Sequence, residues 1–271
     1  MSLNEAVKDY EKADVTPESN AFSTVPKEDT CTIIVPLYGY YRDSVIKGLD
    51  AEVLRVSLLR LRSFYHKVYY VFVGERGRVD SSVYNVLIGK SMSGNTLGVE
   101  VEQNSTYSTY LDEGLKFALE RTTSKYFICV NPWLLTGKNT VDTMIERVNK
   151  TDIAVCSSYD FRKAGVDAAV FDNYKYNPAR EYRDSAFDIN FFGFTRPVAE
   201  KTVIDVTYRT REYLEQDMFQ TFHSKGHNIV ISQNMPIYSF EFDWSLLESE
   251  EDSEIDKAYF QKKWGFLPVT K

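Results

Sequence analysis

Two side chains that can bind a ligand, Asn131 and Trp133, directly follow an apolar run at residues 126–130. A short, continuous apolar run of this kind is typical of a strand that is buried on both faces of a sheet. Pro132 lacks the amide hydrogen that a sheet ladder needs, so the strand must end there. In open α/β sheets, ligands bind beyond the carboxyl ends of the strands. We therefore expect Asn131 to bind a ribose or phosphate oxygen or to cap the turn, and Trp133 to stack on a sugar or base or to pack at the rim of the core.

A carboxylate, Glu215, lies in a segment whose pattern predicts a helix at residues 211–225. At about 100° per residue, Glu215 falls on the apolar face of this helix, whereas Asp217 points well away from it. The side chains that define this face are Leu214, Met218, Phe219 and Phe222. A carboxylate on an apolar face is costly unless it has a partner or a task. Glu215 is therefore the first candidate for a reactive group and Asp217 the second, although an acid near the start of a helix also favours the helix dipole.

Alternating strand and helix patterns must position these groups. Apolar, β-branched runs predict strands at residues 31–38, 68–73, 98–102, 126–130 and 152–156. Apolar residues at helical spacing predict helices between them at residues 43–61, 81–88, 107–121 and 139–148. This alternation predicts an α/β fold with a mixed, mainly parallel sheet, flanked by helices and joined by right-handed crossovers.

The alternation stops at residues 157–189, a polar and aromatic stretch that contains a tyrosine-rich segment at 159–182. A long irregular segment inside a compact domain is usually functional or mobile, and this one is interpreted as an acceptor lid or a partner surface. Further along the chain, strands are predicted at residues 190–194, 228–232 and 235–242. The helix at 211–225 is predicted to end at Gly226.

The composition limits the class of protein. The chain has 271 residues, of which 43% are hydrophobic and 26% charged, as is ordinary for a globular protein. A net charge of −7 argues against broad nucleic-acid binding, which needs a basic surface. No apolar run has membrane-spanning length and no signal-peptide pattern is present, so we expect a cytoplasmic protein. Three cysteines, Cys31, Cys129 and Cys156, lack metal-ligand spacing and are expected to be buried free thiols.

The two ends of the chain differ from its middle. Residues 1–28 have no hydrophobic period and are interpreted as a flexible arm. Residues 29–245 are expected to form the α/β domain, with one half to about residue 135 and a second half after it. Residues 246–271 begin with an acidic stretch at 248–256, expected to be solvated, and end in an amphipathic helix that could dock on the domain.

Five segments follow one another in the order and spacing of a known family. Residues 32–38, Thr-Ile-Ile-Val-Pro-Leu-Tyr, resemble its first strand "TIIVPLYN", and residues 104–118, with Asp112-Glu113-Gly114-Leu115, are similar to its "N-x-G…N-x-G-l-x-x-A" segment. Residues 124–128 resemble the "geYi" run that precedes its metal motif. Residues 215–230 resemble its "E-D…r-x-x-G-y-x-i" helix, and residues 260–265 its "F…KWG" tail. Over residues 31 to about 265, the chain thus resembles the inverting glycosyltransferases of family 2, which implies the GT-A fold.

The chain departs from this family where a metal would bind. The family has Asp-x-Asp after the central strand, whose carboxylates hold Mg²⁺ or Mn²⁺ against the sugar diphosphate, and this chain has Asn131-Pro132-Trp133. A turn whose Asp contacts the base is replaced by residues 73–77, in which Glu75 could substitute, and residues 236–241 lack the family's late histidine. No metal ligand is therefore predicted, and the use of a divalent cation stays open. Basic side chains that could neutralise the diphosphate instead are Arg76, Lys138, Arg180 and Arg183.

The resemblance implies a role for each matched residue. Counted back from Gly226, Glu215 falls on the position of the base that deprotonates the acceptor hydroxyl. Phe192 and Gly193 would lie on the acceptor side, in a strand with a close backbone approach. Residues on the donor and nucleotide side would be Pro36, Leu37, Tyr38, Glu75, Asp112, Asn131 and Trp133.

These features predict a glycosyltransferase that moves a sugar from a nucleotide-diphosphate sugar to the hydroxyl of a glycan or other acceptor by an inverting displacement. The missing carboxylates support a second hypothesis, a catalytically inactive GT-A-like domain that binds a nucleotide, a glycan or a protein. A nucleotidyltransferase shares the sheet, but it usually needs a glycine-rich, basic loop after the first strand. Residues 36–42 do not supply such a loop.

Overall fold

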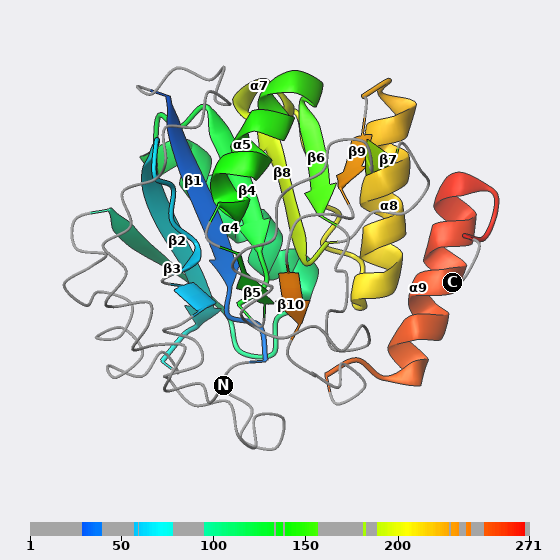
Figure 1. Ribbon diagram of the computed structural model, residues 1–271. Coiled ribbons are helices and arrows are strands. Elements are labelled where there is room, and N and C mark those ends of the chain that lie inside the picture. The colour runs from blue at the N-terminus through cyan, green and yellow to red at the C-terminus, as the bar shows by residue number, and fades with distance from the viewer. Residues whose placement is uncertain are drawn as a thin grey trace.

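The computed structural model describes residues 29–39, 57–58, 60–77, 95–132, 134–137, 139–156, 181–182, 189–227, 229–232, 237–239 and 247–268. Within these residues, eight strands form one sheet in the order β3-β2-β1-β4-β8-β6-β9-β7 (Figure 1). Their bounds are β1 Thr30–Pro36, β2 Lys67–Glu75, β3 Thr96–Val101, β4 Tyr126–Val130, β6 Ile153–Cys156, β7 Glu181–Tyr182, β8 Phe191–Thr195 and β9 Ile229–Ser232. A second, two-stranded sheet pairs β5, Leu134–Thr136, with β10, Ile237–Ser239.

Most neighbouring strands in the large sheet are parallel. β1 pairs in parallel with β2 and β4, β2 with β3, and β6 with β9. β8 is antiparallel to both of its neighbours, β4 and β6, and β7 is antiparallel to β9. The prediction of a mixed, mainly parallel α/β sheet is therefore confirmed.

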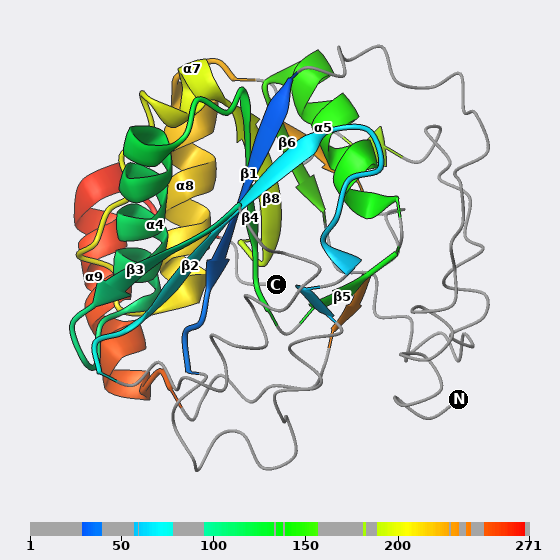
Figure 2. The ribbon, with the colours of Figure 1, turned by 90° about the vertical axis from the view of Figure 1, so that its left-hand side faces the viewer.

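Helices cover both faces of this sheet (Figures 1 and 2). Their bounds are α4 Tyr107–Arg121, α5 Thr140–Thr151, α7 Arg196–Ala199, α8 Arg211–Ser224 and α9 Glu250–Trp264. α5 lies on one face, α4 and α8 lie on the other, and α9 packs against α8. Alternate residues of the central strands enter the two cores, because successive side chains of a strand point to opposite faces. In β1, Ile34 joins the core under α4 and α8, whereas Ile33 and Val35 join the core under α5.

The end of α8 and the start of α4 have capping residues. The left-handed backbone of Gly226, with φ of 74°, follows the end of α8 as predicted. α4 is capped by Thr106, whose side chain accepts a hydrogen bond from the Thr109 amide.

The buried Cys31 and Cys129 are free thiols, as expected, and burial raises the pKa of each.

The C-terminal segment agrees with its prediction in part. The acidic stretch at 248–256 was expected to be solvated, and Glu250, Glu251 and Glu254 in the first turns of α9 are exposed, but Asp256 is only 1% exposed. Its carboxylate accepts hydrogen bonds from the amides of Arg209 and Thr210, at 2.9 and 2.7 Å, and so caps the start of α8 from another helix. The acidic side chains of this stretch therefore include a structural cap.

Several predictions concern residues outside the described part of the chain. They are the arm at 1–28, the helix at 81–88, most of the helix at 43–61 and most of the tyrosine-rich segment at 159–182. Trp133, Lys138, Arg180 and Arg183 also lie outside the described residues.

Gly193 lies in β8, opposite Ile128 of the neighbouring antiparallel strand β4. A Cβ atom on this residue would lie 3.0 Å from the carbonyl oxygen of Phe127 and 3.1 Å from Cγ2 of Val148. The close backbone approach predicted here is thus an approach to the protein's own sheet and helix α5. We expect Gly193→Ala to lower the free energy of unfolding by about 1–3 kcal/mol, the usual cost of overpacking a core. Urea denaturation measures this difference, and an unchanged or increased stability would contradict the crowding.

Candidate active site

One edge of the large sheet gathers the ends of its central strands. β1, β2 and β4 run in parallel, so their carboxyl ends lie at the same edge, and the antiparallel β8 begins there. This edge therefore holds Asn131, which follows β4, and Ile189 and Asn190, which precede β8. In open α/β sheets, ligands bind outside this edge.

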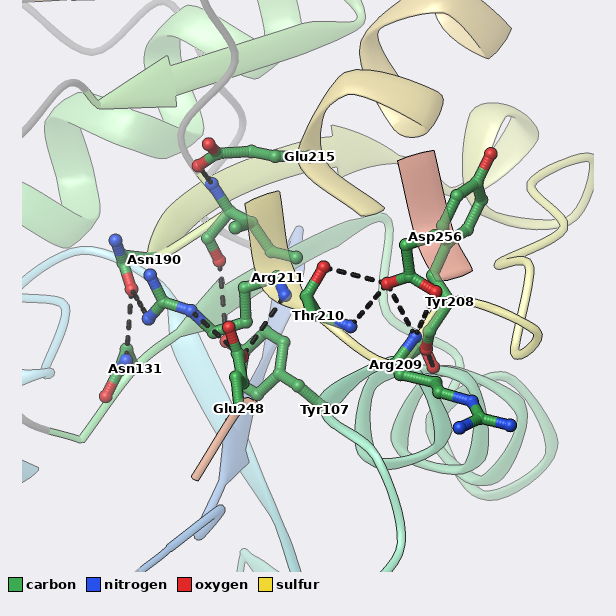
Figure 3. A network of polar contacts seen from close by, with 12 residues as sticks. Tyr107, Asn131, Asn190, Tyr208, Arg209, Thr210, Arg211, Glu215, Glu248 and Asp256 are labelled. Atoms are coloured by element: carbon green, nitrogen blue, oxygen red, sulfur yellow. Dashed lines mark hydrogen bonds and ion pairs between the residues drawn. The ribbon is translucent and has the colours of Figure 1, made fainter. Parts of the chain in front are cut away.

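Asn131 is fixed to Asn190 by two hydrogen bonds. Its backbone amide donates to the Asn190 carbonyl at 2.7 Å, and its side-chain amide donates to Oδ1 of Asn190 at 3.0 Å (Figure 3). Asn131 is only 2% exposed. Its carbonyl also accepts from the amide of Leu134 at 3.1 Å, which forms the turn into β5. The side chain thus joins two strand ends rather than capping that turn.

Glu215 lies on the neighbouring helix and reaches the same pair of residues. Its Oε1 accepts a hydrogen bond from the amide of Ile189 at 2.8 Å, and its side chain is half-buried. Asn131 and Glu215 are 84 positions apart in the sequence, but they bind the consecutive residues Asn190 and Ile189 (Figure 3). The structure therefore brings the two main candidates of the sequence analysis to one place.

Arg211 completes this group, and the sequence analysis did not identify it. Its Nη1 donates to Oδ1 of Asn190 at 3.0 Å, and its guanidinium lies 5.8 Å from the centre of the Tyr107 ring. Arg211 precedes Glu215 by four residues in α8, a spacing that puts both on one side of the helix. This spacing was the signal in the sequence that could have identified it.

Glu248 is the carboxylate that faces Arg211. Its Oε1 accepts from the Arg211 backbone amide at 3.1 Å and lies 4.0 Å from Nε of the same residue. Burial raises the pKa of Glu248 to about 7, against the opposing effect of Arg211. Glu248 therefore changes its charge near neutral pH, next to the cation of the site.

This raised pKa predicts a pH-dependent stability. Because the folded protein holds the proton of Glu248 more tightly than the unfolded chain does, the stabilisation is complete below pH 4.5 and is lost as pH rises through 7. Over this window we expect a loss of about 3 kcal/mol in the free energy of unfolding, which Glu248→Gln abolishes. Urea denaturation at pH 4.5 and pH 8 measures it, with the exposed Glu251→Gln as the control variant. The same pH dependence in Glu248→Gln and the wild type would contradict it.

Asp217 was expected to point well away from the apolar face of α8, and on that side of the helix it is covered by α9, so that it is only 2% exposed. Its carboxylate accepts hydrogen bonds from the Tyr208 hydroxyl at 3.0 Å and the Trp264 indole at 2.7 Å, and it pairs with Lys263 at 2.8 Å. The helical wheel of α8 could not show this burial, because it does not include α9.

Among the described residues, the predicted nucleotide-side residues of β1, of β2 and of the turn after β1 lie at this edge and are buried. Leu37 donates its amide to the Val73 carbonyl at 2.8 Å, and the Tyr38 ring packs edge-on against Tyr107 and Tyr110. Pro36 ends β1 and is buried as well. Glu75 is 4% exposed, and its Oε1 accepts from the Asn104 amide at 3.2 Å. These side chains therefore pack inside the fold at this edge of the sheet.

Four further predicted residues do not join the group at Asn190. Asp112 forms an ion pair with Lys116 at 2.6 Å, one turn further along α4. Phe192 is fully buried, with its ring 5.7 Å from that of Phe194, and Gly193 is enclosed by β4 and α5. Phe192 and Gly193 are thus interior residues of the sheet, and their role on the acceptor side stays a prediction. Arg76 pairs with Glu102 at 2.7 Å, on the exposed surface.

Metal-ligand clusters and membrane-spanning helices are both absent from the described residues. In the part of the chain that the structure describes, no cluster of three or more His, Cys, Asp or Glu side chains could hold a metal ion. No described helix is both long enough and apolar enough to cross a membrane.

Comparisons with known proteins relate the fold to two kinds of transferase. No protein-family model matches the sequence, and no curated protein matches it. The structure of S. aureus TarS, a glycosyltransferase, is similar over 89% of this chain and 40% of TarS, with a TM-score of 0.57 and 13% identity. Its 1–349 fragment is similar over 89% of this chain and 67% of the fragment, with a TM-score of 0.53 and 12% identity. The chain thus spans less than half the length of the longer TarS structure.

A nucleotidyltransferase has a similar structure as well. The inositol-1-phosphate CTP transferase from T. maritima is similar over 86% of this chain and 97% of its own, with a TM-score of 0.52 and 12% identity. At such low identities the likeness shows the fold alone. The α/β sheet of this chain is therefore Rossmann-like and of the GT-A type.

Proposed function

We propose that this protein is a glycosyltransferase that moves a sugar from a nucleotide-diphosphate sugar to a hydroxyl acceptor by a single inverting displacement. The observation that carries the proposal is the attachment of Asn131 and Glu215 to the adjacent residues Asn190 and Ile189. A displacement needs the donor and the base held close together. The edge of the sheet at Asn190 supplies such a place, in a fold shared with a glycosyltransferase.

In this proposal Glu215 is the base. The acceptor hydroxyl gives its proton to the Glu215 carboxylate as its oxygen forms a bond to the anomeric carbon. The bond from that carbon to the diphosphate oxygen breaks at the same time, and its electron pair leaves with the nucleoside diphosphate. The loop after β1, together with Asn131 and Trp133, is assigned to the donor side, in the half of the domain that extends to about residue 135.

A second candidate function follows from Asn131. An amide at this position offers a neutral oxygen where a hard divalent cation prefers carboxylates. This favours a GT-A-like domain that binds a nucleotide or a glycan without turnover. The two functions differ in whether a bound donor is consumed.

A thermal-shift panel tests the proposed function. It uses UDP, GDP, CDP, TDP and ADP and their sugars, each with Mn²⁺ or with EDTA, because ligands that bind the native state raise its apparent stability. We expect one nucleotide and its sugar to raise the melting temperature, and that donor to be consumed once an acceptor is supplied. Binding without consumption would favour the non-catalytic domain. The absence of a shift with every nucleotide would overturn the proposed function.

A further inference from the structure

The guanidinium of Arg211 is a cationic group at this edge of the sheet, beside Asn131 and Asn190. Its side chain is 14% exposed, so the charge is largely withdrawn from water. Among the described residues, the guanidinium contacts Oδ1 of Asn190 at 3.0 Å, the Tyr107 ring at 5.8 Å and Glu248 at 4.0 Å from Nε (Figure 3). A guanidinium held in one orientation is suited to two parallel hydrogen bonds with phosphate oxygens.

The amide of Asn131 fits this cation better than a carboxylate would. Asn131 and Arg211 both donate to the same oxygen, Oδ1 of Asn190, each at 3.0 Å. A carboxylate at position 131 has no hydrogen to donate, so it would face the Asn190 oxygen with a like partial charge. It would also add a second anion near Arg211, beside Glu248. With an amide at position 131, the positive charge of Arg211 is therefore less neutralised than it would be beside an aspartate.

The carboxylate of Glu248 is the protein's own anion beside Arg211. Glu248 accepts a hydrogen bond from the Arg211 backbone amide and lies near the Arg211 guanidinium. A helix-terminal amide and a guanidinium are both groups that bind phosphate. A carboxylate in this position competes electrostatically with any incoming anion. Its raised pKa, near 7, is consistent with a carboxylate that is only partly stabilised by its cation.

We propose that Arg211 is the group that binds the diphosphate of the donor, and that Glu248 occupies it until the diphosphate arrives. This inference rests on the proposed function and identifies the cation of its leaving group. As the sugar–oxygen bond breaks, the diphosphate gains negative charge, and Arg211 donates hydrogen bonds to it. Asn131 and Asn190 are positioning residues, since they act on the diphosphate through Arg211.

Inorganic pyrophosphate is the probe that separates this inference from the proposed function. Its binding to the full chain is measured by calorimetry at pH 8 in EDTA, beside the nucleoside diphosphates of the panel. We expect Arg211→Met to weaken pyrophosphate binding about 10- to 100-fold, because charged hydrogen bonds are lost. Arg209→Met is the matched control: it removes the same charge two positions away, where Arg209 pairs with Asp252 and is half exposed. This control should bind pyrophosphate as the wild type does.

Glu248→Gln is expected to change pyrophosphate affinity in the opposite direction, which misfolding cannot explain. At pH 8 the wild-type carboxylate is charged, and the amide removes its competition, so we expect pyrophosphate to bind about 5-fold more tightly. An unfolded variant cannot produce a gain in affinity.

The outcomes distinguish the two ideas. Arg211-dependent binding of pyrophosphate without binding of any nucleotide would support the diphosphate site and overturn the nucleotide-sugar donor. Nucleotide binding that is equal in wild type and Arg211→Met would support the donor and overturn the role of Arg211. Weaker binding in Glu248→Gln, or no binding of pyrophosphate by the wild type, would also overturn the inference.

Discussion

Glu215→Gln is expected to lower the rate of sugar transfer about 100- to 10,000-fold, the range that a positioned general base contributes. The glutamine keeps an oxygen that can accept the amide hydrogen of Ile189, which Glu215 now binds at 2.8 Å. The start of β8 should therefore stay in place. What the variant loses is the negative oxygen that takes the acceptor's proton. Nucleotide affinity, measured by thermal shift or calorimetry, should be close to that of the wild type.

A matched variant makes this result specific. Glu212 lies three residues before Glu215 on α8 but is exposed to solvent. Glu212→Gln removes the same charge from the same helix and should leave the transfer rate within about 2-fold, because an exposed charge is screened. The base assignment would be abandoned if Glu215→Gln retained more than half of the wild-type rate, or if both variants lost activity equally.

The local part of the fold was predictable from the sequence. The apolar run at Tyr126–Val130 and the helical spacing at Tyr107–Arg121 gave the bounds of β4 and α4 to the residue. Both signals are local, since burial on both faces or on one stripe leaves a continuous or periodic pattern. β5 was missed because three residues, Leu134–Thr136, carry too little pattern; the strand depends on β10, about one hundred residues further along the chain.

The site was predictable only as separate positions. Asn131 and Glu215 were both identified, one from the end of a strand and one from an apolar helix face. The residues that connect them, Ile189 and Asn190, lie at the end of an irregular stretch and offered no periodic signal. Arg211 was not distinguished from other surface cations, because its importance comes from a hydrogen bond to a residue 21 positions away. Its spacing of four residues from Glu215 would have placed both side chains on one side of the helix, had the two positions been compared.

The same limitation explains why the burial of Asp217 was not predicted, because the helical wheel of α8 includes no other helix. Its carboxylate binds the helix that follows later in the chain: Lys263 and Trp264 come from the last turn of α9. Burial and the charge of Asp217 raise the pKa of Tyr208, so this hydroxyl stays protonated and donates to the carboxylate. With its oxygens engaged by these groups, Asp217 has the contacts of a residue that holds α9 on α8.

Asp217→Ala is therefore expected to lower the free energy of unfolding by about 3 kcal/mol, as measured by urea denaturation. The substitution leaves the buried Tyr208 hydroxyl and the half-buried Trp264 indole without this acceptor, at about 1–3 kcal/mol each, and removes one of two carboxylates paired with Lys263. The second carboxylate, Asp205, lies 2.8 Å from Lys263 and keeps the loss near the lower limit. Glu254→Ala, on the exposed side of α9 where Glu254 pairs with Lys257, is the control and should cost less than about 0.5 kcal/mol.

Asp217→Asn then separates this structural role from catalysis. The amide keeps an oxygen for Tyr208 and Trp264 but loses the ion pair with Lys263, so we expect a smaller loss of stability, about 1–2 kcal/mol. At a temperature where this variant is folded, sugar transfer should proceed within a few-fold of the wild-type rate, since general-base catalysis is assigned to Glu215. A folded Asp217→Asn with a 100-fold slower transfer would move the base to Asp217, and α9 would then cover a catalytic carboxylate rather than a structural one.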